Sequence, residues 1–164
     1  MRMSLGENMI VTLFGESHGP AVGALIEGMP ANVEFDLEQL ITDMVSRRPG
    51  SGLASKRKET DDVEILSGVN NGKTTGMPIL LLIRNQDVRS KDYSFLPYQP
   101  RPGHVDHPIN IKTEGAADLR GGGSFSARLT AGLVAASSIS RNIIPDEWKI
   151  EATVGALGGL EGDE

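Results

Sequence analysis

Short apolar runs rich in branched residues alternate along this chain with stretches of glycine, proline and charge. The runs MIVTLF (9–14) and AVGALIEGM (21–29) flank a GESHG loop, and their length and composition predict two strands. Pro30 and the alternating ANVEF (31–35) end this unit. Further along, VEILSGV (63–69) and KTTGMPILLLIRN (73–85) lie on either side of an Asn-Gly pair, which predicts a hairpin.

Two segments have the patterns of helices. Residues 36–48 (DLEQLITDMVSRR) begin with a capping Asp36 and end with Arg47 and Arg48, where positive charge suits the helix dipole. Their apolar residues follow helical spacing: Leu37, Leu40, Ile41, Met44 and Val45. Residues 124–143 (SFSARLTAGLVAASSISRNI) are small and apolar almost all round, which predicts a buried helix.

The remaining segments are irregular or short. Residues 49–62 predict a loop rich in glycine and charge, and residues 86–118 carry four prolines with few periodic apolar positions. An irregular span of that length is usually functional or disordered. WKIEATVGALGG (148–159) predicts a last strand. Helices separated by hairpins favour an α+β fold over strict βαβ units, with one domain over residues 1–164.

Composition narrows the class of protein. The 38% of hydrophobic and 23% of charged residues are typical of a globular protein. Because the chain has no apolar run of the roughly 20 residues that cross a bilayer, we predict no membrane partner. A net charge of −6 argues against broad nucleic-acid binding. The chain has no cysteine, and its start lacks the apolar core of a secretory signal, so we expect a cytoplasmic protein.

Gly15–Gly19 matches G-x-S-x-G, the turn that presents the nucleophilic serine of many hydrolases. That turn needs a helix directly after the serine, whereas Pro20 and a β-rich run follow Ser17 here. The short motif also occurs often by chance. We therefore expect Ser17 to cap a local turn, and a serine hydrolase is the weaker interpretation.

His18 and His104 each adjoin a glycine, where backbone can approach a ligand closely. A lone histidine is more often a satisfied structural residue, but imidazole is also the side chain best suited to proton transfer near neutral pH. A metal site formed by His104, Asp106 and His107 is a further interpretation. It lacks the usual ligand spacing and a clear additional ligand.

The segment DLRGGGSFSAR (118–128) runs through three glycines into the second predicted helix. Exposed amides at a helix start bind anions, and Arg120 and Arg128 would add guanidinium groups. The same pattern is equally typical of a turn that lets a helix pack closely on a sheet. A second basic cluster, usually a solvated face, spans Arg47 to Lys58. Two such clusters in an acidic chain favour a local site for a phosphorylated or polycarboxylate ligand.

Five motifs in order resemble one enzyme family, chorismate synthase. They are FGESHGPAVGALIEGMP, SRRPG, VEILSGVNNGKTTGMPILLLIRNQDVRSKDYS, RPGHVDH and RGGGSFSARLTAGLVAA. The resemblance implies a β-α-β sandwich-like core with buried helices and a homotetramer. It implies 1,4-anti elimination of phosphate from 5-enolpyruvylshikimate 3-phosphate to give chorismate, with reduced FMN required. Some members of the family also use NADPH as flavin reductases.

The resemblance also assigns residues. His18 corresponds to the acid that assists phosphate departure, and His104 to the group that stabilises or protonates reduced flavin. Flavin contacts fall on Ser124, Phe125 and Ser126. Contacts to substrate phosphate or NADP fall on Arg47, Ser126, Ala127 and Arg128. This agrees with the general chemistry, because cations and a proton donor stabilise the charge that develops on departing phosphate.

Three positions depart from the family pattern, and the chain is short. Ser124 stands where the family usually has arginine or histidine, Leu53 lies near the place of a common arginine, and His107 replaces a common tyrosine. The 164 residues resemble only the N-terminal half of the family. The alternative is therefore a non-catalytic half-enzyme or binding module that needs a complementary C-terminal chain.

Overall fold

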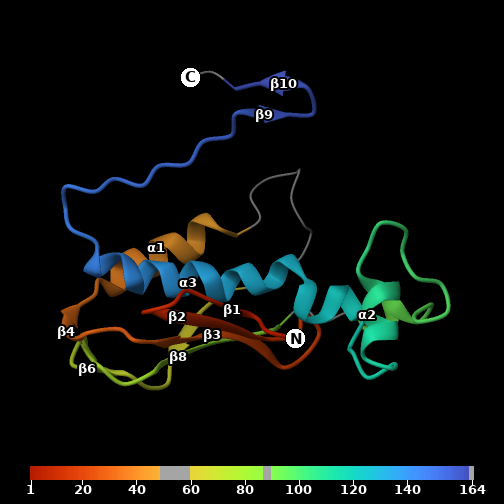
Figure 1. Ribbon diagram of the computed structural model, residues 1–164, viewed down its shortest axis with the longest axis horizontal. Helices are drawn as coiled ribbons and strands as arrows, with labels where there is room; N and C mark the ends of the chain where they lie inside the picture. Colours follow the sequence, from red (N-terminus) through yellow and green to blue (C-terminus); the bar gives the residue numbers. More distant parts are fainter. Residues whose placement is uncertain (49–59, 87–89, 163–164) are drawn as a thin grey trace.

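A five-stranded antiparallel sheet forms the centre of the molecule, as seen in a computed structural model that describes residues 1–48, 60–86 and 90–162 (Figure 1). Its strands in spatial order are β1 (Ser4–Leu5), β2 (Ile10–Gly15), β3 (Ala21–Glu27), β8 (Ile79–Arg84) and β5 (Val63–Ile65). The two strands predicted around the GESHG loop are confirmed as the β2–β3 pair.

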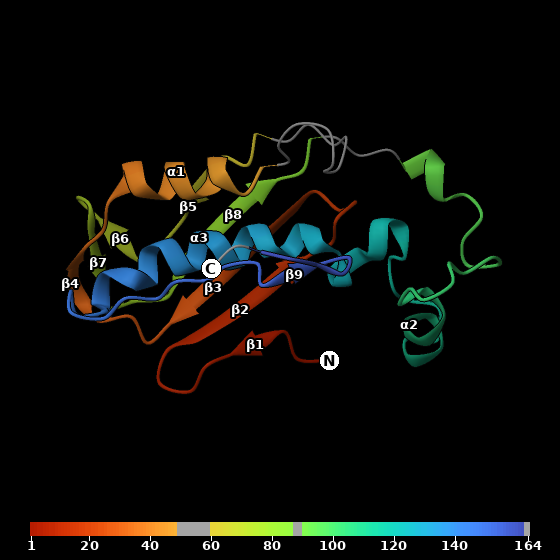
Figure 2. The same ribbon diagram turned by 90° about the horizontal axis from the view of Figure 1, so that it is seen from above.

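One face of this sheet carries the core. In the β3–β8 register, Val22 lies opposite Ile83, and Ala24 lies opposite Leu81. Because alternate residues of a strand point to the same side, these pairs share one face, and all four side chains are completely buried. Helices α1 (Leu37–Ser46) and α3 (Thr130–Ser140) cover that face (Figure 2).

Helix α3 lies unusually close to β3. A Cβ atom on Gly132 would be only 2.5 Å from the carbonyl oxygen of Gly23, so the glycine permits the approach of helix to strand. The helix begins at Thr130, not at Ser124 as predicted, because residues 120–129 form the short helices η2 (Arg120–Phe125) and η3 (Ala127–Leu129). The predicted burial of this helix is confirmed for one face, which includes Ala131, Ala135 and Ile139, whereas Leu133 is exposed.

Helix α1 begins after its predicted cap but ends at Ser46, before the predicted Arg47 and Arg48. Asp36 caps it by accepting hydrogen bonds from the backbone N–H groups of Glu38 and Gln39. Its predicted apolar stripe divides: Leu40 and Met44 pack into the core, whereas the other three residues remain exposed. Those three are Leu37, Ile41 and Val45.

The predicted hairpin around Asn71-Gly72 is confirmed and is larger than two strands. Strands β6 (Val69–Asn70) and β7 (Lys73–Thr75) pair across the turn, where Asn71 and Gly72 both have positive φ. Strand β4 (Ala31–Glu34) joins them in a three-stranded sheet. The outer arms continue as β5 and β8 of the central sheet.

The proline-rich span 86–118 is ordered where the structure describes it. It contains η1 (Ser90–Tyr93) and a helix that the sequence pattern did not predict, α2 (Asp106–Lys112). Proline is tolerated in a first helical turn, and Pro108 lies there. This span lies at the end of the sheet beyond α3 (Figure 1).

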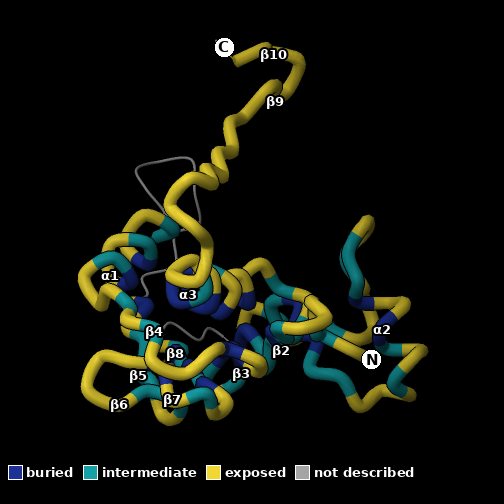
Figure 3. The backbone as a smooth tube through the Cα atoms, turned by 60° about the vertical axis from the view of Figure 1, so that its left-hand side comes forward, coloured by how far each residue is buried: buried dark blue, intermediate teal, exposed yellow. Residues whose placement is uncertain are grey.

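The strand predicted over 148–159 is wrong. After η4 (Arg141–Ile143) the chain is extended and exposed, and only β9 (Ala156–Leu157) and β10 (Leu160–Glu161) form, paired with each other (Figure 3). An apolar run becomes a long strand only when a neighbouring strand accepts its backbone hydrogen bonds.

The α+β class is confirmed. The described residues contribute one large sheet and its helices to the expected sandwich. Among them, none of the helices has the length and apolar content needed to span a membrane.

Candidate functional site

A loop of three glycines brings both predicted histidines together. Gly121, Gly122 and Gly123 all have positive φ, a conformation that glycine adopts at little cost. A Cβ atom on Gly121 would lie 2.6 Å from His18 Cδ2, and one on Gly122 would lie 3.2 Å from His104 Cε1. The two imidazoles therefore pack against adjacent glycines, although 86 residues (104 − 18) separate them along the chain.

Ser17 holds the GESHG loop on the glycine loop. Its side chain is completely buried, and its hydroxyl lies 3.1 Å from the carbonyl oxygens of both Arg120 and Gly121. Its backbone N–H donates to the carbonyl of Gly123. Strand β3, not a helix, follows the loop. The hydrolase interpretation is therefore wrong. Ser17 is structural, but its hydroxyl contacts the distant glycine loop, whereas it was expected to cap a local turn.

His18 is buried beside an aromatic ring. The Tyr93 ring lies in a T-shaped contact with the imidazole, at a centroid distance of 4.8 Å and an interplanar angle of 77°. The guanidinium carbon of Arg101 lies 5.4 Å from the centroid of the same tyrosine ring, within the range of a cation–π contact. Tyr93 therefore contacts both His18 and Arg101, and Arg101 in turn contacts His104.

His104 is held by a buried carboxylate. Its Nδ1 lies 2.7 Å from Asp106 Oδ1, and Asp106 is completely buried. Arg101 donates three hydrogen bonds to the same carboxylate, from its backbone N–H and from two guanidinium nitrogens. These hydrogen bonds from Arg101 hold the pKa of Asp106 far below its ordinary value, against the opposing effect of burial.

The proposed metal site is not formed by its three predicted residues. Asp106 already accepts from Arg101 and His104, while His107 is exposed on α2. Within residues 1–48, 60–86 and 90–162, no group of three or more histidine, aspartate or glutamate side chains is arranged to hold a metal ion.

A second buried carboxylate joins two of the predicted phosphate-binding arginines. Asp61 accepts hydrogen bonds from both Arg47 and Arg128 on its two oxygens. Its side chain is 1% exposed, and those of Arg47 and Arg128 are 17% and 5% exposed. The pair of arginines is thus part of a buried ion cluster, with Arg47 the more accessible.

Asn85 connects this cluster to the His18 loop. Its side-chain oxygen accepts from Arg128 Nε at 2.9 Å, while its amide group donates to the carbonyls of Glu16 and Gly19. Those two carbonyls lie on either side of Ser17 and His18. Asp61, Arg128 and Asn85 therefore form a chain of hydrogen bonds that ends at the backbone beside His18.

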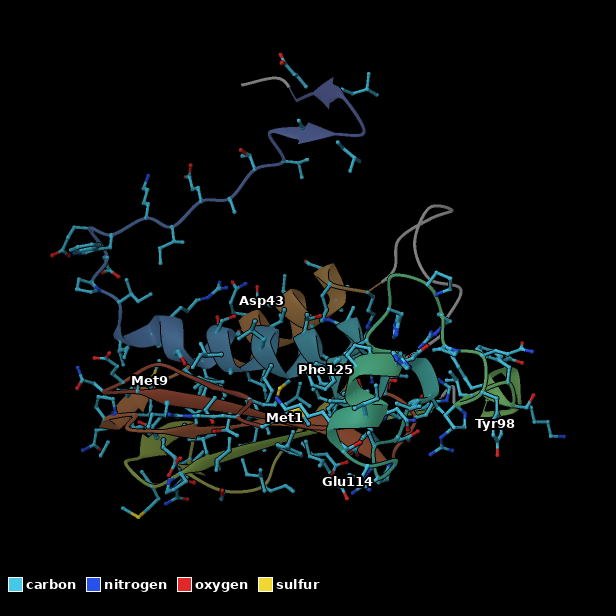
Figure 4. The ribbon with its side chains drawn as sticks, turned by 45° about the vertical axis from the view of Figure 1, so that its right-hand side comes forward. Met1, Met9, Asp43, Tyr98, Glu114 and Phe125 are labelled. Carbon is cyan, nitrogen blue, oxygen red and sulfur yellow. The ribbon has the colours of Figure 1, made fainter. Side chains whose placement is uncertain are left out.

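The glycine loop also borders a pocket of about 340 Å³. Gly122, Ser124 and Phe125 line it together with Met1 and Asp118, and Figure 4 shows Phe125 and Met1 on this side of the molecule. Asp118 forms an ion pair with Arg120. Hydrogen bonds from Arg120 lower the pKa of Asp118, against the opposing effect of burial.

The other predicted contacts lie just after the glycines. The Ser126 side chain accepts from the backbone N–H of Arg128, Ala127 is exposed, and Phe125 is 43% exposed. The remaining basic residues of the second cluster, Lys56, Arg57 and Lys58, and the departure at Leu53, lie outside the described residues.

Sequence reasoning missed Arg101, Asp61 and Asn85, and it considered Asp106 only as a metal ligand. Arg101 and Asp106 stand in the same short motif as His104, so a paired His-x-Asp was a local signal. Asp61 and Asn85 had no such signal, because their partners are 14 to 69 residues away.

An α+β fold with two histidines on one glycine loop, flanked by buried guanidinium groups, defines a protein suited to anionic ligands and proton transfer. The sequence profile described as chorismate synthase matches residues 9–162. The chain belongs to the chorismate synthase family.

Individual relatives agree with this assignment. The chorismate synthase of Aeropyrum pernix is 49% identical over 161 residues, 98% of this chain and 42% of the relative. That of Thermococcus kodakarensis is 44% identical over 157 residues, 95% of this chain and 44% of the relative. A crystal structure of chorismate synthase aligns with a TM-score of 0.59 at 33% identity, covering 83% of this chain and 33% of that one. The chain thus spans less than half the length of these relatives.

Proposed function

We propose that this chain forms the His18 and His104 side of a chorismate synthase active site. The reaction is the 1,4-anti elimination of phosphate from 5-enolpyruvylshikimate 3-phosphate to give chorismate. The observation that carries the proposal is the convergence of His18 and His104 on Gly121 and Gly122, in a chain that resembles chorismate synthases over most of its length.

His18 and Arg47 act on the phosphate in this proposal. Departure of phosphate places negative charge on its bridging oxygen, and a protonated imidazole at His18 lowers the barrier by donating a proton there. Arg47 is the more exposed of the two arginines on Asp61 and supplies positive charge to the phosphate or to NADP. Arg128 has its guanidinium among protein acceptors, so it acts by holding Asn85 and the His18 loop.

The residues after the glycine loop fit a flavin. Phe125 presents an exposed ring, Ser124 and Gly122 line the pocket, and the His104 ring lies against Gly122. Ser124, Phe125 and Ser126 would hold reduced FMN, and His104 would keep a proton at its edge. When bound, reduced flavin supplies an electron reversibly to a reaction without net redox change. The proposal includes NADPH as a possible reductant of the flavin, a homotetramer and a cytoplasmic location.

The first test measures chorismate and phosphate release from 5-enolpyruvylshikimate 3-phosphate under anaerobic conditions with reduced FMN. The 164-residue chain is assayed alone and with the C-terminal segment of the Aeropyrum pernix relative added in trans. We expect equal amounts of chorismate and phosphate in at least the second assay. Formation of product only there would assign the chain the half-enzyme role. No product in either assay, with no FMN binding by fluorescence quenching, would contradict the proposal.

The second test assigns the two histidines. In the active preparation, His18→Ala and His104→Ala each lower turnover by about 10²–10⁴-fold, the range usual for a lost acid–base group. His107→Ala is the matched control, because His107 is exposed and lies three residues from His104. Turnover near the wild-type value in both variants, with the control unchanged, would overturn the residue roles.

A further inference from the structure

We infer that Asp106 is a positioning residue that keeps the proton of neutral His104 on Nδ1 and turns Nε2 toward the glycine loop. The inference deepens the proposed function, which concerns what His104 does, but the tautomer itself follows from contacts within residues 101–106 and Gly122. It also replaces the metal-ligand interpretation of Asp106.

The Asp106 carboxylate is fixed in place. Its Oδ2 accepts from the backbone N–H of Arg101 at 3.0 Å and from Nε at 2.8 Å. Its Oδ1 accepts from the second guanidinium nitrogen at 2.8 Å and lies 2.7 Å from His104 Nδ1. With donors on both oxygens, the completely buried carboxylate cannot rotate without breaking charge-assisted hydrogen bonds.

The two contacts of His104 Nδ1 decide which nitrogen carries the proton. Asp106 is ionised and can only accept, whereas Arg101 can only donate. A bare Nδ1 lone pair 2.7 Å from a carboxylate oxygen would be repelled, while a protonated Nδ1 donates a short hydrogen bond there. Arg101 lies 3.1 Å from Nδ1 because both groups donate to the same Asp106 carboxylate, and neither of them donates to the other.

The other ring nitrogen of His104, Nε2, lies on the side of the ring that faces the glycine loop. A Cβ atom on Gly122 would lie 3.4 Å from His104 Nε2, so this nitrogen sits against the glycine loop. With Nδ1 protonated, neutral Nε2 has a lone pair, and protonated Nε2 becomes a donor. A histidine whose Nδ1 is tied to a buried carboxylate can thus exchange protons only through Nε2.

Asp106→Asn tests the assignment because it should reverse the tautomer. The amide oxygen of asparagine is expected at the Oδ2 position, where two Arg101 donors point, because only one Arg101 donor points at Oδ1. The amide nitrogen then takes the Oδ1 position, loses that one guanidinium hydrogen bond and donates to His104 Nδ1, which requires the proton on Nε2. An analogous aspartate-to-asparagine change in the serine protease triad preserves geometry and produces the wrong tautomer.

The measurement is long-range ¹H–¹⁵N correlation NMR on the uniformly ¹⁵N-labelled 164-residue chain, at a pH where the ring is neutral. The chain has only three histidines, so each gives its own cross-peak pattern. We expect the Nδ1–H pattern for His104 in the wild type and the Nε2–H pattern in Asp106→Asn, with His107 unchanged. Asp118→Asn is the control, since Asp118 pairs with Arg120 and should leave the His104 tautomer unchanged.

An Nε2–H pattern for His104 in the wild-type chain would overturn the inference, even if the variant fails to fold. So would an unchanged pattern in a folded Asp106→Asn chain. In an active preparation, Asp106→Asn should lose about 10²-fold in turnover, and adding it to His104→Ala should cause no loss beyond that of His104→Ala alone. The absence of product in both assays of the first test, together with no FMN binding, would contradict the proposed function and leave the NMR result standing.

Discussion

Asp61 and Asp106 are both buried aspartates that accept hydrogen bonds from two basic side chains, but the two centres are built differently. Asp106 binds Arg101 and His104, which lie within five residues of it. Asp61 binds Arg47 and Arg128, which lie 14 and 67 residues away. The first centre is therefore a local structure of one loop, whereas the second joins α1, the segment before β5 and η3.

The two centres also differ in how exposed the basic partners of each aspartate are. The side chains of Arg101 and His104 are 30% and 34% exposed, compared with 17% and 5% for Arg47 and Arg128. A charge that loses its partner is costly when water cannot replace that partner. The comparison indicates that the Asp61 centre stabilises the fold and that the Asp106 centre orients the His104 ring.

Removing the Asp61 carboxylate should have the largest effect. Asp61→Ala leaves two guanidinium groups buried without their shared anion, and we expect a loss of about 3–5 kcal/mol in the free energy of unfolding. Urea denaturation followed by circular dichroism measures it. Asp62→Ala is the matched control, because Asp62 is 79% exposed and should change stability by less than about 0.5 kcal/mol. Equal effects of the two variants would remove the distinction between the centres.

Gly121→Ala tests the loop on which the two histidines meet. The new Cβ would lie 2.6 Å from His18 and Ser17 at a φ of +58°, so strain and overpacking add to a loss of about 2–4 kcal/mol. Gly72→Ala is the control, since its φ is +74° with nothing within 4 Å, and it isolates the backbone cost of about 1 kcal/mol. Thermal and urea unfolding compare them. An equal loss in both would mean that His18 does not pack on the glycine loop.

Asp106→Ala should cost less than Asp61→Ala, about 1–3 kcal/mol, because water can reach Arg101 and His104 once the carboxylate is gone. The same urea titration measures the loss, with Asp92→Ala, an exposed aspartate, as the reference. A loss as large as that of Asp61→Ala would show that the local centre carries as much of the fold as the long-range one.

The smallest effect is on pH dependence. Because its hydrogen bonds lower the pKa of Asp106 in the folded state, ionised Asp106 contributes stability above the unfolded pKa of about 3.9. This contribution is lost as the pH falls below that value through the folded pKa. The difference in unfolding free energy between wild type and Asp106→Asn should thus stay constant from about pH 7 to 5 and narrow below about pH 4. Denaturant titrations across that range test it, and a constant difference down to pH 2 would contradict it.

Local sequence determined the features whose physical cause lies within a few residues. The Asp36 cap, the Asn71-Gly72 turn and the β2–β3 strands were predicted because capping, positive φ and apolar runs act over short distances. The family resemblance likewise indicated His18 and His104. Helix α2 was missed because Pro108 and the prolines before it obscured a short helix, and the strand over 148–159 was predicted without knowledge of its neighbours.

Only the tertiary structure decided which charges meet. No local pattern predicts that Asp61 pairs with Arg128 or that Asn85 bonds the carbonyls of Glu16 and Gly19. Ion pairs and hydrogen bonds between distant segments depend on how the sheet and α3 bring those segments together. The sequence by itself determined the local conformations and the reactive residue types. Packing then determined which of them share one glycine loop, since burial leaves a charged group stable only beside a partner that the fold supplies.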